Sequence, residues 1–307
     1  MQNVKGKKVF VGLSGGVDSA VSAALLAEGG AEVVGVFIKG WYPPELPCTW
    51  AEDRRDAMRV AAHLGIPFVT LNASKEYKES VIDYLLSEYR AGRTPNPDIF
   101  CNRDIKFGVF YQYAMAHGAD FIATGHYRSG EKDQTYFLWA VPKEVLAKTI
   151  FPVGDMDKKD VRNLARRLDL PVADKPDSQG ICFLGSVSVE EFLKAELGSD
   201  NPALLYTIGQ RKDGAYVVSK DVAAKTVTTS PLRAPTDLSP IPFITPNWFL
   251  EPEQATGALL RYRGREVGGQ IQGAAFIPSE LPEEVPVPGQ SIVFYHGSHL
   301  VGGGIIQ

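Results

Sequence analysis

The sequence predicts an α/β protein with a doubly wound parallel sheet, followed by a small middle segment and a C-terminal β-barrel. In the first half, short Val-rich runs alternate with stretches of helical periodicity, which is the pattern of βαβ units. After about residue 197, Pro and Gly become frequent and the helical periodicity disappears. From about residue 240, short β-prone runs prevail, which is typical of a small all-β domain.

The elements follow from their hydrophobic patterns, taken in chain order. Short apolar runs predict parallel strands at 8–13, 32–38, 67–71 and 120–124. A helix is predicted at 18–28, and further helices are predicted where apolar residues recur at helical spacing, near 57–64, 82–89, 107–114 and 158–168. Strands of the second half are predicted at 215–219, 259–263 and 292–295, and the Pro-rich segment 231–246 is predicted to be a linker or an extended edge.

The composition is that of an ordinary cytosolic enzyme. The 307 residues are 44% hydrophobic and 22% charged, with a formal net charge of −4, and they suffice for about two domains. The mild acidity does not exclude a nucleic-acid partner, because a local basic patch matters more than the total charge. No run approaches the ~18 apolar residues of a membrane helix, and the apolar run 9–13 is too short for a secretory signal. We therefore expect a cytoplasmic location and no membrane partner.

The sharpest motif is a glycine-rich loop between the first predicted strand and the first predicted helix, with the sequence Ser14-Gly15-Gly16-Val17-Asp18-Ser19. Its glycines let the backbone approach a phosphate, and the following helix offers free N–H donors. Asp18 is placed to hold a Mg²⁺ that bridges phosphates. The loop lacks the Gly-Lys-Ser/Thr ending of a Walker motif, and it resembles the pyrophosphate-binding loop (PP-loop) of ATP pyrophosphatases. The alternative is a strand–helix turn without a ligand.

Three cysteines are present, Cys48, Cys101 and Cys182, and no Cys-x-x-Cys pair occurs. This argues against a zinc knuckle or a cysteine-ligated iron–sulfur cluster. Cys101 follows a loop stiffened by two prolines, and Cys182 lies in a loop before the helix expected near Ser188. On spacing alone, both are more typical of small buried hydrophobic residues than of reactive thiols.

Taken together, the motifs change that interpretation. The sequence contains, in this order, SGGVDS, RTPNPDIFCN, ATGHY, KDQTYFL, DSQGICF, GQR and PGQSIVFY. This series resembles the tRNA-specific 2-thiouridylases over essentially the whole chain. The resemblance implies ATP-dependent 2-thiolation of the wobble uridine of tRNA, by adenylation of the C2 carbonyl oxygen and sulfur transfer from a cysteine persulfide. It implies ATP and Mg²⁺ as cofactors, and tRNA and a cysteine desulfurase or sulfur-relay protein as partners.

The resemblance also implies roles for single residues. Cys182 matches the cysteine that carries the persulfide, and Cys101 its partner thiol, whereas Cys48 is given a structural role. Asp98 matches an acid/base near the target base. The matched ATP contacts are Gly12, Leu13, Ser14, Gly15, Gly16, Val17, Asp18, Ser19, Ile38 and Gly125. The matched tRNA contacts are Asn96, Pro97, Asp98, His126, Lys132, Asp133, Gln134, Arg261, Tyr262 and Gln290.

The tail from residue 240 contains no Lys, and its Arg residues are Arg261, Arg263 and Arg265. On a strand these would share one face and could meet phosphate. The exposed Lys158, Arg162, Arg166 and Arg167 of the helix at 158–168 offer a second basic face. In both places a merely solvated surface is the alternative.

The resemblance predicts three domains, namely a PP-loop catalytic domain with the adenine nucleotide alpha hydrolase-like fold at 1–197, a reduced central segment at 198–235, and a tRNA-contacting β-barrel at 236–307. The stretch between Cys182 and Gly209 is shorter than the family's central segment, which leaves tRNA selection in doubt. Two other functions stay open. One is a PP-loop synthetase acting on a small molecule, and the other is a non-catalytic tRNA-binding protein.

Overall fold

The structure is a computed structural model that describes residues 3–43, 50–130, 133–176, 187–232 and 238–307. The chain divides into two compact units. Unit 1 comprises residues 1–80 and 101–186, and unit 2 comprises residues 81–100 and 187–307. Residues 81–100 and 187–197 thus pack with the second half of the chain. The predicted domain boundaries at 197 and 235 stay a prediction.

Unit 1 is built on a parallel sheet. Within the described residues it has five strands in the order β3-β2-β1-β4-β5. The strands are β1 (Lys8–Gly12), β2 (Glu32–Lys39), β3 (Phe68–Asn72), β4 (Phe121–Ala123) and β5 (Thr149–Ile150). Neighbouring strands pair in parallel throughout. The predicted parallel sheet is confirmed, and the sequence patterns missed only the two-residue β5.

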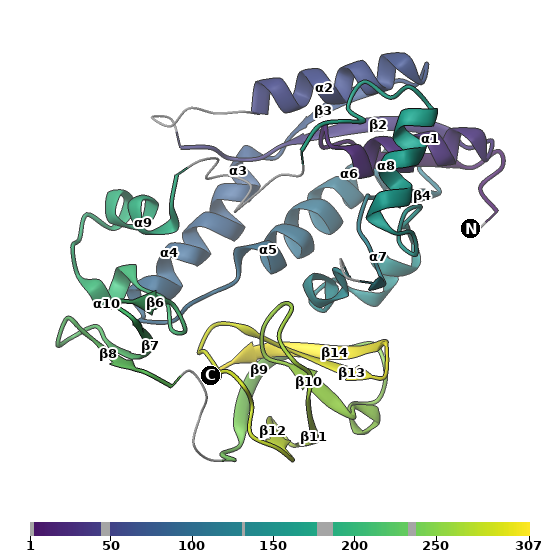
Figure 1. The fold of residues 1–307 in the computed structure, drawn as a ribbon. Helices are drawn as coiled ribbons and strands as arrows, with labels where there is room; N and C mark the ends of the chain where they lie inside the picture. The colour runs from purple at the N-terminus through teal and green to yellow at the C-terminus, as the bar shows by residue number, and fades with distance from the viewer. Residues whose placement is uncertain (1–2, 44–49, 131–132, 177–186, 233–237) are drawn as a thin grey trace. The chain divides into compact units, whose positions relative to one another are not determined.

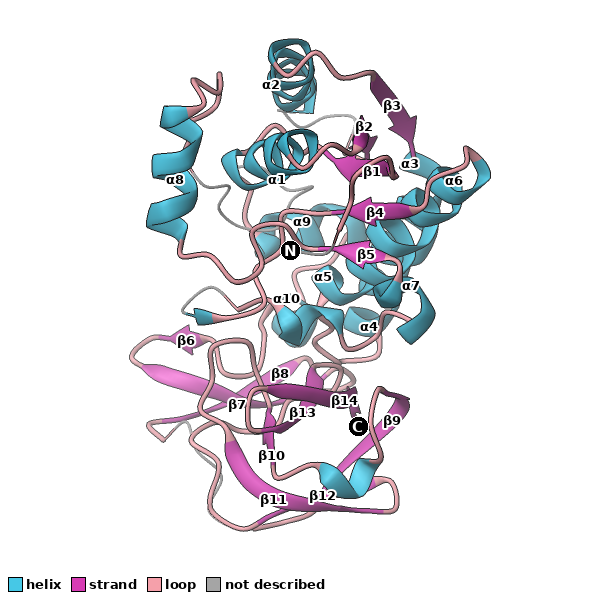
Figure 2. Ribbon diagram, turned by 90° about the vertical axis from the view of Figure 1, so that its right-hand side faces the viewer, coloured by secondary structure: helices cyan, strands magenta, loops and turns pink. Residues whose placement is uncertain are grey.

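Helices cover both faces of this sheet, as Figure 2 shows for α1 and α8 on one side and α6 and α7 on the other. Val9 and Val11 of β1 belong to an apolar cluster with α1, α2 and α8, whereas Phe10 packs in a second cluster with α6. This alternation follows from the two-residue period of a strand. The described residues of this unit include the helices α1 (Val17–Glu28), α2 (Trp50–His63), α3 (Ser74–Tyr77), η2 (Cys101–Val109), α6 (Phe110–Ala116), η4 (Thr135–Leu138), α7 (Lys143–Ala147) and α8 (Lys158–Arg167).

One helix begins earlier than its pattern predicts. The stripe at 107–114 predicts a start near Phe107, but a π-helical segment, η2, begins at Cys101 and leads into α6. The wider turn of a π-helix displaces side chains from the 3.6-residue period on which the prediction rests. The π-helical stretch η1 (Lys78–Ile82), which crosses from unit 1 into unit 2, likewise precedes α4.

Unit 2 begins with α4 (Asp83–Arg90) and α5 (Pro97–Phe100), and continues with α9 (Val189–Leu197) and α10 (Pro202–Leu205). A capping box starts α9, in which Ser188 and Glu191 satisfy each other's backbone N–H groups. A three-stranded antiparallel sheet follows among the described residues, formed by β6 (Arg211–Lys212), β7 (Ala215–Asp221) and β8 (Thr226–Ser230).

The C-terminal part of unit 2 is a closed barrel with the strand order β10-β11-β12-β9-β14-β13 (Figure 1). Its elements are β9 (Ile241–Trp248), η5 (Pro252–Gln254), β10 (Gly257–Leu259), β11 (Val267–Gln272), β12 (Ala275–Pro278), β13 (Ser291–His296) and β14 (His299–Ile306). A Cβ on Gly302 would lie 2.4 Å from the ring of Trp248, so this glycine makes room for the aromatic core. The predicted barrel is confirmed. The Pro-rich segment 231–246 was predicted to be a linker or an extended edge. From Ile241 it is extended, as part of strand β9, but this strand is not an edge because the barrel is closed.

Candidate active site

The glycine-rich loop lies where the parallel sheet reverses its strand order. It follows β1, whose two neighbours are β2 and β4, and ligands bind at such a switch point in open α/β sheets. Gly15 has a φ of +80°, and a Cβ there would lie 2.3 Å from the carbonyl oxygen of Asp53. Both the backbone angle and the lack of space therefore demand glycine.

Two serine hydroxyls hold the shape of the loop. Ser19 Oγ donates to the carbonyl oxygen of Gly16 at 3.1 Å and accepts from the backbone N–H of Ser14 at 3.2 Å. The hydroxyl of Ser14 accepts from the backbone N–H of Gly16 at 3.3 Å. Helix α1 begins directly after Gly16, and the first turn of a helix presents N–H groups that have no acceptor within the helix. The loop can therefore hold an anion such as a phosphate.

The other predicted ATP contacts lie on neighbouring strand ends. Gly12 ends β1, and the backbone N–H of Leu13 donates to the carbonyl oxygen of Val36 on β2 at 2.8 Å. Ile38 lies two residues further along β2 and is half-buried. Gly125 follows β4, and a Cβ there would lie 2.8 Å from the backbone nitrogen of Ser19. The fold thus gathers the ends of β1 and β4 around the start of α1.

Asp18 has two partners that sequence patterns did not reveal. Lys158 Nζ lies 2.7 Å and 2.8 Å from the two carboxylate oxygens of Asp18, and the hydroxyl of Tyr127 donates to Oδ1 at 2.6 Å. The side chain of Lys158 is only 16% exposed, so the prediction that it lies on an exposed face was wrong. Its helix, α8, packs on α1 through Val161 and Ala165. The periodicity of α8 shows that these two residues are buried, but not which helix they meet.

Cys101 is buried at the start of η2, and the side chain of the next residue, Asn102, bonds to η4 and to the segment that follows β4. Asn102 Nδ2 donates to the carbonyl oxygen of Phe137 at 3.3 Å, and Oδ1 lies 3.2 Å from His126 Nε2. Because Oδ1 can only accept, Nε2 carries the proton of the ring. His126 Nδ1 then accepts from the hydroxyl of Thr124 at 2.8 Å.

The imidazole of His126 is thereby held neutral. Burial, with a smaller contribution from the charge of Lys106, lowers its pKa to about 3. The ring also packs against Phe107 and Phe151. His126 is 9% exposed, and both ring nitrogens bind groups of the protein. Its side chain therefore fixes the residue after Cys101, and its predicted contact with tRNA stays a prediction.

The loop before Cys101 belongs to unit 2 up to Phe100. Its Asn96 Oδ1 accepts from the backbone N–H of Asp98 at 3.1 Å, which starts the single turn α5 at Pro97. Asn96 and Asp98 are half-buried, and Pro97 is buried. This turn presents the polar side chains that the sequence predicted to contact a base.

Comparison with known proteins identifies the family. Residues 7–186 match a family described as the tRNA methyl transferase HUP domain. The chain is 38% identical over 351 residues to the tRNA-specific 2-thiouridylase MnmA 2 of Geobacillus kaustophilus, covering 98% of this chain and 94% of that protein. The chain belongs to the tRNA-specific 2-thiouridylase family. Its Streptococcus thermophilus relative, also named tRNA-specific 2-thiouridylase MnmA, is 39% identical, with 98% of this chain and 95% of the relative covered.

Among solved structures, the U34-tRNA thiolase NcsA from Methanococcus maripaludis is similar at a TM-score of 0.42, with 21% identity over 65% of this chain and 71% of that one. The alignment to the Geobacillus 2-thiouridylase extends over 351 positions, and this chain has 307 residues. The alignment therefore includes positions of that relative that have no counterpart in this sequence.

Several predicted tRNA contacts of the 2-thiouridylase pattern have bonds within the protein. Gln134 Oε1 accepts from the backbone N–H of Tyr127 at 3.1 Å, and Asp133 Oδ1 accepts from the backbone N–H of Thr135 at 2.7 Å. Gln290 Nε2 donates to the carbonyl oxygen of Thr94 at 2.7 Å. Lys132, Cys48 and Cys182 lie outside the described residues.

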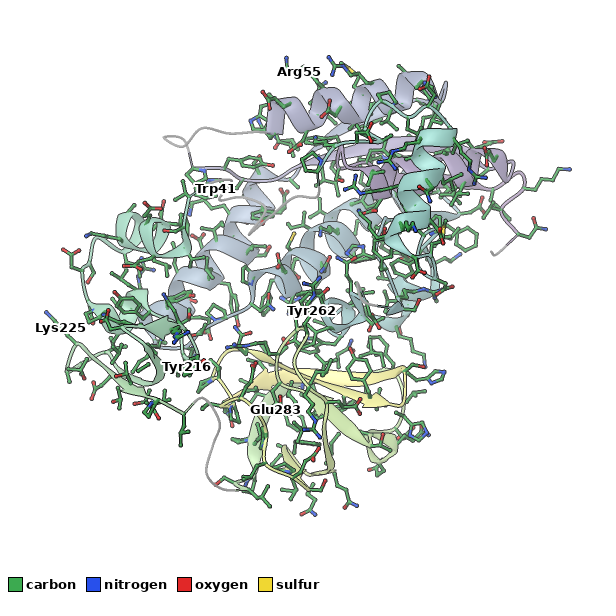
Figure 3. The ribbon with its side chains drawn as sticks, in the orientation of Figure 1. Trp41, Arg55, Tyr216, Lys225, Tyr262 and Glu283 are labelled. Carbon is green, nitrogen blue, oxygen red and sulfur yellow. The ribbon has the colours of Figure 1, made fainter. Side chains whose placement is uncertain are left out.

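The predicted row of arginines was wrong. Strand β10 ends at Leu259, and the backbone N–H of Gly264 donates to the carbonyl oxygen of Arg261 at 3.0 Å, which closes a turn. Arg263 has a φ of +60° in this turn, so the three guanidinium groups cannot alternate along a strand. Arg261 Nε lies 3.1 Å from Glu284 Oε2. Arg265 forms an ion pair with Glu283. Figure 3 labels Glu283 and Tyr262.

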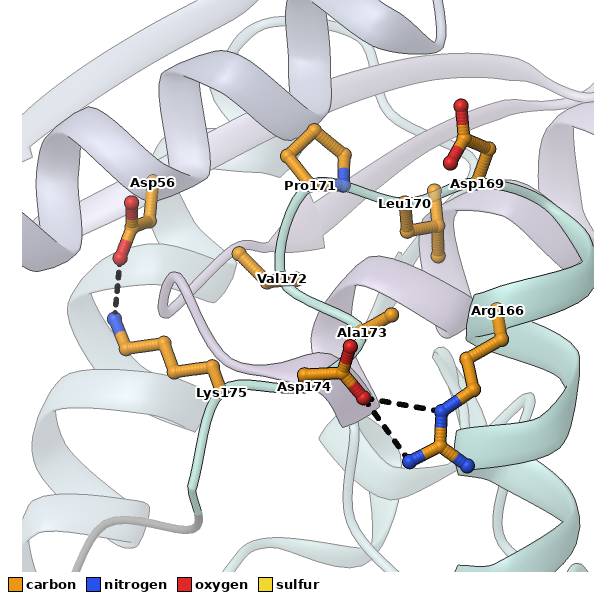
Figure 4. A pocket seen from close by; sticks show the side chains of 9 residues that line it. All are labelled: Asp56, Arg166, Asp169, Leu170, Pro171, Val172, Ala173, Asp174 and Lys175. Carbon is orange, nitrogen blue, oxygen red and sulfur yellow. Dashed lines mark hydrogen bonds and ion pairs between the residues drawn. The ribbon is translucent and has the colours of Figure 1, made fainter.

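The described part of unit 1 also has an open hollow of about 560 Å³ beside α2 (Figure 4). Arg166 and Asp174 form an ion pair at its wall, and Lys175 Nζ lies 2.7 Å from both Asp53 and Asp56. Burial disfavours the charge of Lys175, but the hydrogen bonds to the two carboxylates outweigh it and raise the pKa of the ammonium group. Both cations of the hollow, Arg166 and Lys175, are paired with carboxylates, and none of the residues that line it belongs to the predicted ATP or tRNA contacts.

Neither a metal cluster nor a membrane span is found in the described ranges. No group of three His, Cys, Asp or Glu side chains there could hold a metal ion. No helix in that part of the chain is long and apolar enough to cross a membrane.

Proposed function

We propose that this protein uses ATP to replace the C2 oxygen of the wobble uridine of tRNA with sulfur taken from a cysteine persulfide. The observation that carries the proposal is the phosphate-binding loop at the start of α1, in a chain that covers 94% of a relative named tRNA-specific 2-thiouridylase. A C2 carbonyl oxygen is a poor leaving group, and converting it to a phosphate ester removes that barrier.

The first step is adenylation. The C2 oxygen of uridine attacks the α-phosphorus of ATP, the bond to the β-phosphate oxygen breaks, and pyrophosphate leaves with the electron pair. The loop N–H groups and the first turn of α1 stabilise the negative charge that develops on the leaving group. Ile38 offers an apolar contact to the adenine, and Gly125 leaves space beside the backbone of Ser19.

Asp18 and Lys158 supply opposite charges at this place. The Asp18 carboxylate is a hard oxygen ligand of the kind that Mg²⁺ takes together with phosphate oxygens. Both its oxygens accept from Lys158, and Oδ2 keeps a further lone pair with which Asp18 would hold the metal ion. The ammonium group of Lys158 lies at the same place and is available to the phosphates. A Mg²⁺ held there would neutralise phosphate charge, and Tyr127 keeps Asp18 oriented.

The second step transfers sulfur. The terminal sulfur of a Cys182 persulfide attacks C2, and AMP leaves with the former C2 oxygen. The Cys101 thiolate then attacks the Cys182 sulfur, the S–S bond to the substrate sulfur breaks, and the base keeps that sulfur as a thiocarbonyl. The product disulfide between Cys101 and Cys182 is reduced by an external thiol. A cysteine desulfurase or a sulfur-relay protein supplies the persulfide.

Asp98 acts as acid/base beside the target base, and Asn96 and Pro97 contact that base. His126 does not compete for this role, because an imidazole with a pKa of about 3 stays neutral at physiological pH. Its hydrogen bond to Asn102 holds the start of η2, beside Cys101, against the segment that follows β4.

The test is reconstitution. Purified protein is incubated with unmodified tRNA, ATP, Mg²⁺, cysteine and a cysteine desulfurase, and the nucleosides are analysed by mass spectrometry. We expect 2-thiouridine at the wobble position, with one AMP and one pyrophosphate formed per sulfur transferred. AMP formation that requires no tRNA would instead indicate a synthetase acting on a small molecule. Binding of tRNA without AMP formation would indicate a non-catalytic RNA-binding protein, and either result would refute the proposal.

A further inference from the structure

Thr94, just before the base-contacting turn, is held by two distant parts of unit 2. Its backbone N–H donates to the carbonyl oxygen of Pro288 at 2.8 Å, and its own carbonyl oxygen accepts from Gln290 Nε2 at 2.7 Å. Its hydroxyl lies 3.4 Å from Lys220 Nζ on β7. Thr94 is 6% exposed. The barrel therefore binds both backbone groups of Thr94, and the three-stranded sheet binds its side chain.

Gly289, between the two barrel residues that bond to Thr94, packs directly on this backbone. It has a φ of +92°, and a Cβ there would lie 3.0 Å from the Thr94 nitrogen and 3.1 Å from Arg93 Cβ. Any other residue would be strained in its backbone and would push the loop away. The close approach of the segment at Gly289 to the segment at Thr94 thus depends on glycine at this position.

Lys220 is a half-buried cation that bonds to a second oxygen acceptor besides Thr94. Its ammonium group also donates to the carbonyl oxygen of Tyr206 at 3.2 Å and lies 5.4 Å from the centre of the Tyr89 ring. Burial lowers the pKa of Lys220 to about 8. The two oxygen acceptors and the ring stabilise the ammonium group, but the lowered pKa shows that they do not fully offset the cost of removing its charge from water.

The backbone between Thr94 and the residues proposed to contact the base has little conformational freedom. The two following pairs are Pro95-Asn96 and Pro97-Asp98. Each proline fixes its own φ and restricts the residue before it to extended conformations. The bond between Asn96 Oδ1 and the Asp98 N–H removes further freedom. Fixing Thr94 at both of its peptide groups therefore fixes the direction in which Asn96 and Asp98 leave the anchor.

We propose that Gln290 and Lys220 are positioning residues, which hold the turn at 96–98 in the orientation that the target base requires. This proposal rests on the proposed function. It implies that the barrel and the three-stranded sheet influence the rate of thiolation as well as the affinity for tRNA. Resemblance assigns Gln290 to a tRNA contact, but in the structure its amide nitrogen binds Thr94.

The experiment compares Gln290→Met, which keeps the length of the side chain but loses the donor, with Gln272→Met, which alters an exposed glutamine on β11 of the same barrel. Single-turnover thiolation at saturating tRNA, the tRNA dissociation constant, and hydrogen exchange of residues 93–100 in the protein without tRNA are measured. For Gln290→Met we expect about tenfold slower thiolation, since one hydrogen bond is lost, tRNA affinity within about twofold of wild type, and faster exchange. The Gln272→Met control should match wild type.

Lys220→Met should slow thiolation in the same manner, and Lys220→Arg, which keeps the donors, should restore part of the rate. Thermal unfolding shows whether each variant is folded, and the hydrogen-exchange readout needs no activity. Unchanged exchange at 93–100 in both Met variants would overturn the proposal. So would a Gln290→Met variant that binds tRNA about tenfold more weakly but reacts at the wild-type rate once saturated. Wild-type protein that forms no 2-thiouridine would instead refute the proposed function, and the exchange data would still decide whether the anchor exists.

Discussion

Lys158 Nζ bridges both carboxylate oxygens of Asp18, at 2.7 Å and 2.8 Å, across 140 positions of sequence. The pair joins the first residue of α8 to the first turn of α1. With side chains 16% and 29% exposed, the two charges are partly shielded from water. An anion that enters the loop thus meets a cation already in place, and that cation can exchange one anionic partner for another.

This relationship predicts that Lys158→Met lowers tRNA-dependent pyrophosphate release by about 100-fold, because the leaving group loses a positive charge. Lys159→Met is the matched control, since Lys159 is the next residue and is exposed. Its rate should equal that of wild type. Equal rates in both variants would mean that Lys158 serves only to neutralise Asp18.

Asp18→Ala should abolish pyrophosphate release while the fold persists, because the loop loses its only carboxylate. Release is measured by a coupled pyrophosphate assay, and folding by circular dichroism. A folded Asp18→Ala protein with wild-type turnover would remove the phosphate-binding role from this loop.

Cys182→Ser should fail to carry persulfide sulfur, whereas Cys48→Ser should keep substantial thiolation activity. Each protein is incubated with a desulfurase and radiolabelled cysteine, and the label on the protein is counted after gel filtration. Label retained by Cys182→Ser at the wild-type level would contradict the proposed relay.

The buried His126 predicts a pH dependence of stability. Its folded pKa of about 3 lies below its unfolded value of ~6.5, so between these values the unfolded chain binds the additional proton. Stability is therefore lost as the pH falls below the unfolded value, by about 2 kcal/mol at pH 5 for this one group. His126→Gln removes the titration. Urea unfolding at pH 7 and pH 5 should show a smaller loss for the variant than for wild type, and an equal loss would show that His126 is not buried in the neutral form.

Because Arg263 and Arg265 lie in and after the turn that follows β10, rather than on a strand, they are expected to contribute unequally to tRNA binding. Arg265 is already paired with Glu283 at 3.0 Å, whereas Arg263 is exposed and stacks 5.2 Å from the ring of Tyr262. Arg263→Gln should therefore lower the log–log salt slope of tRNA binding by about one unit, and Arg265→Gln should lower it less. Filter binding at several salt concentrations measures both slopes. Equal, unchanged slopes would place the RNA surface elsewhere.

Much of the fold could be predicted because its signals are local. Val9, Phe10 and Val11 alternate between the two apolar clusters of the sheet, as a two-residue period requires. The same period, applied to 259–263, failed at Arg261, because a turn bond to Gly264 outweighs β-propensity there. The start of η2 at Cys101 was missed as well, because a π-helix does not keep the spacing that helix patterns assume.

The sequence by itself determined the parallel sheet, the barrel and the glycine-rich loop, because each is encoded in contiguous residues whose periodicity or backbone freedom acts locally. It also indicated the family, because the motifs occur together in one order. Only the tertiary structure decided the partners of the functional side chains. Lys158 reaches Asp18 across 140 positions, and Gln290 reaches Thr94 across 196. Such contacts depend on how α8 packs on α1 and how the barrel closes against the loop at 93–97, and no local pattern of residues reports which distant side chains that packing brings together.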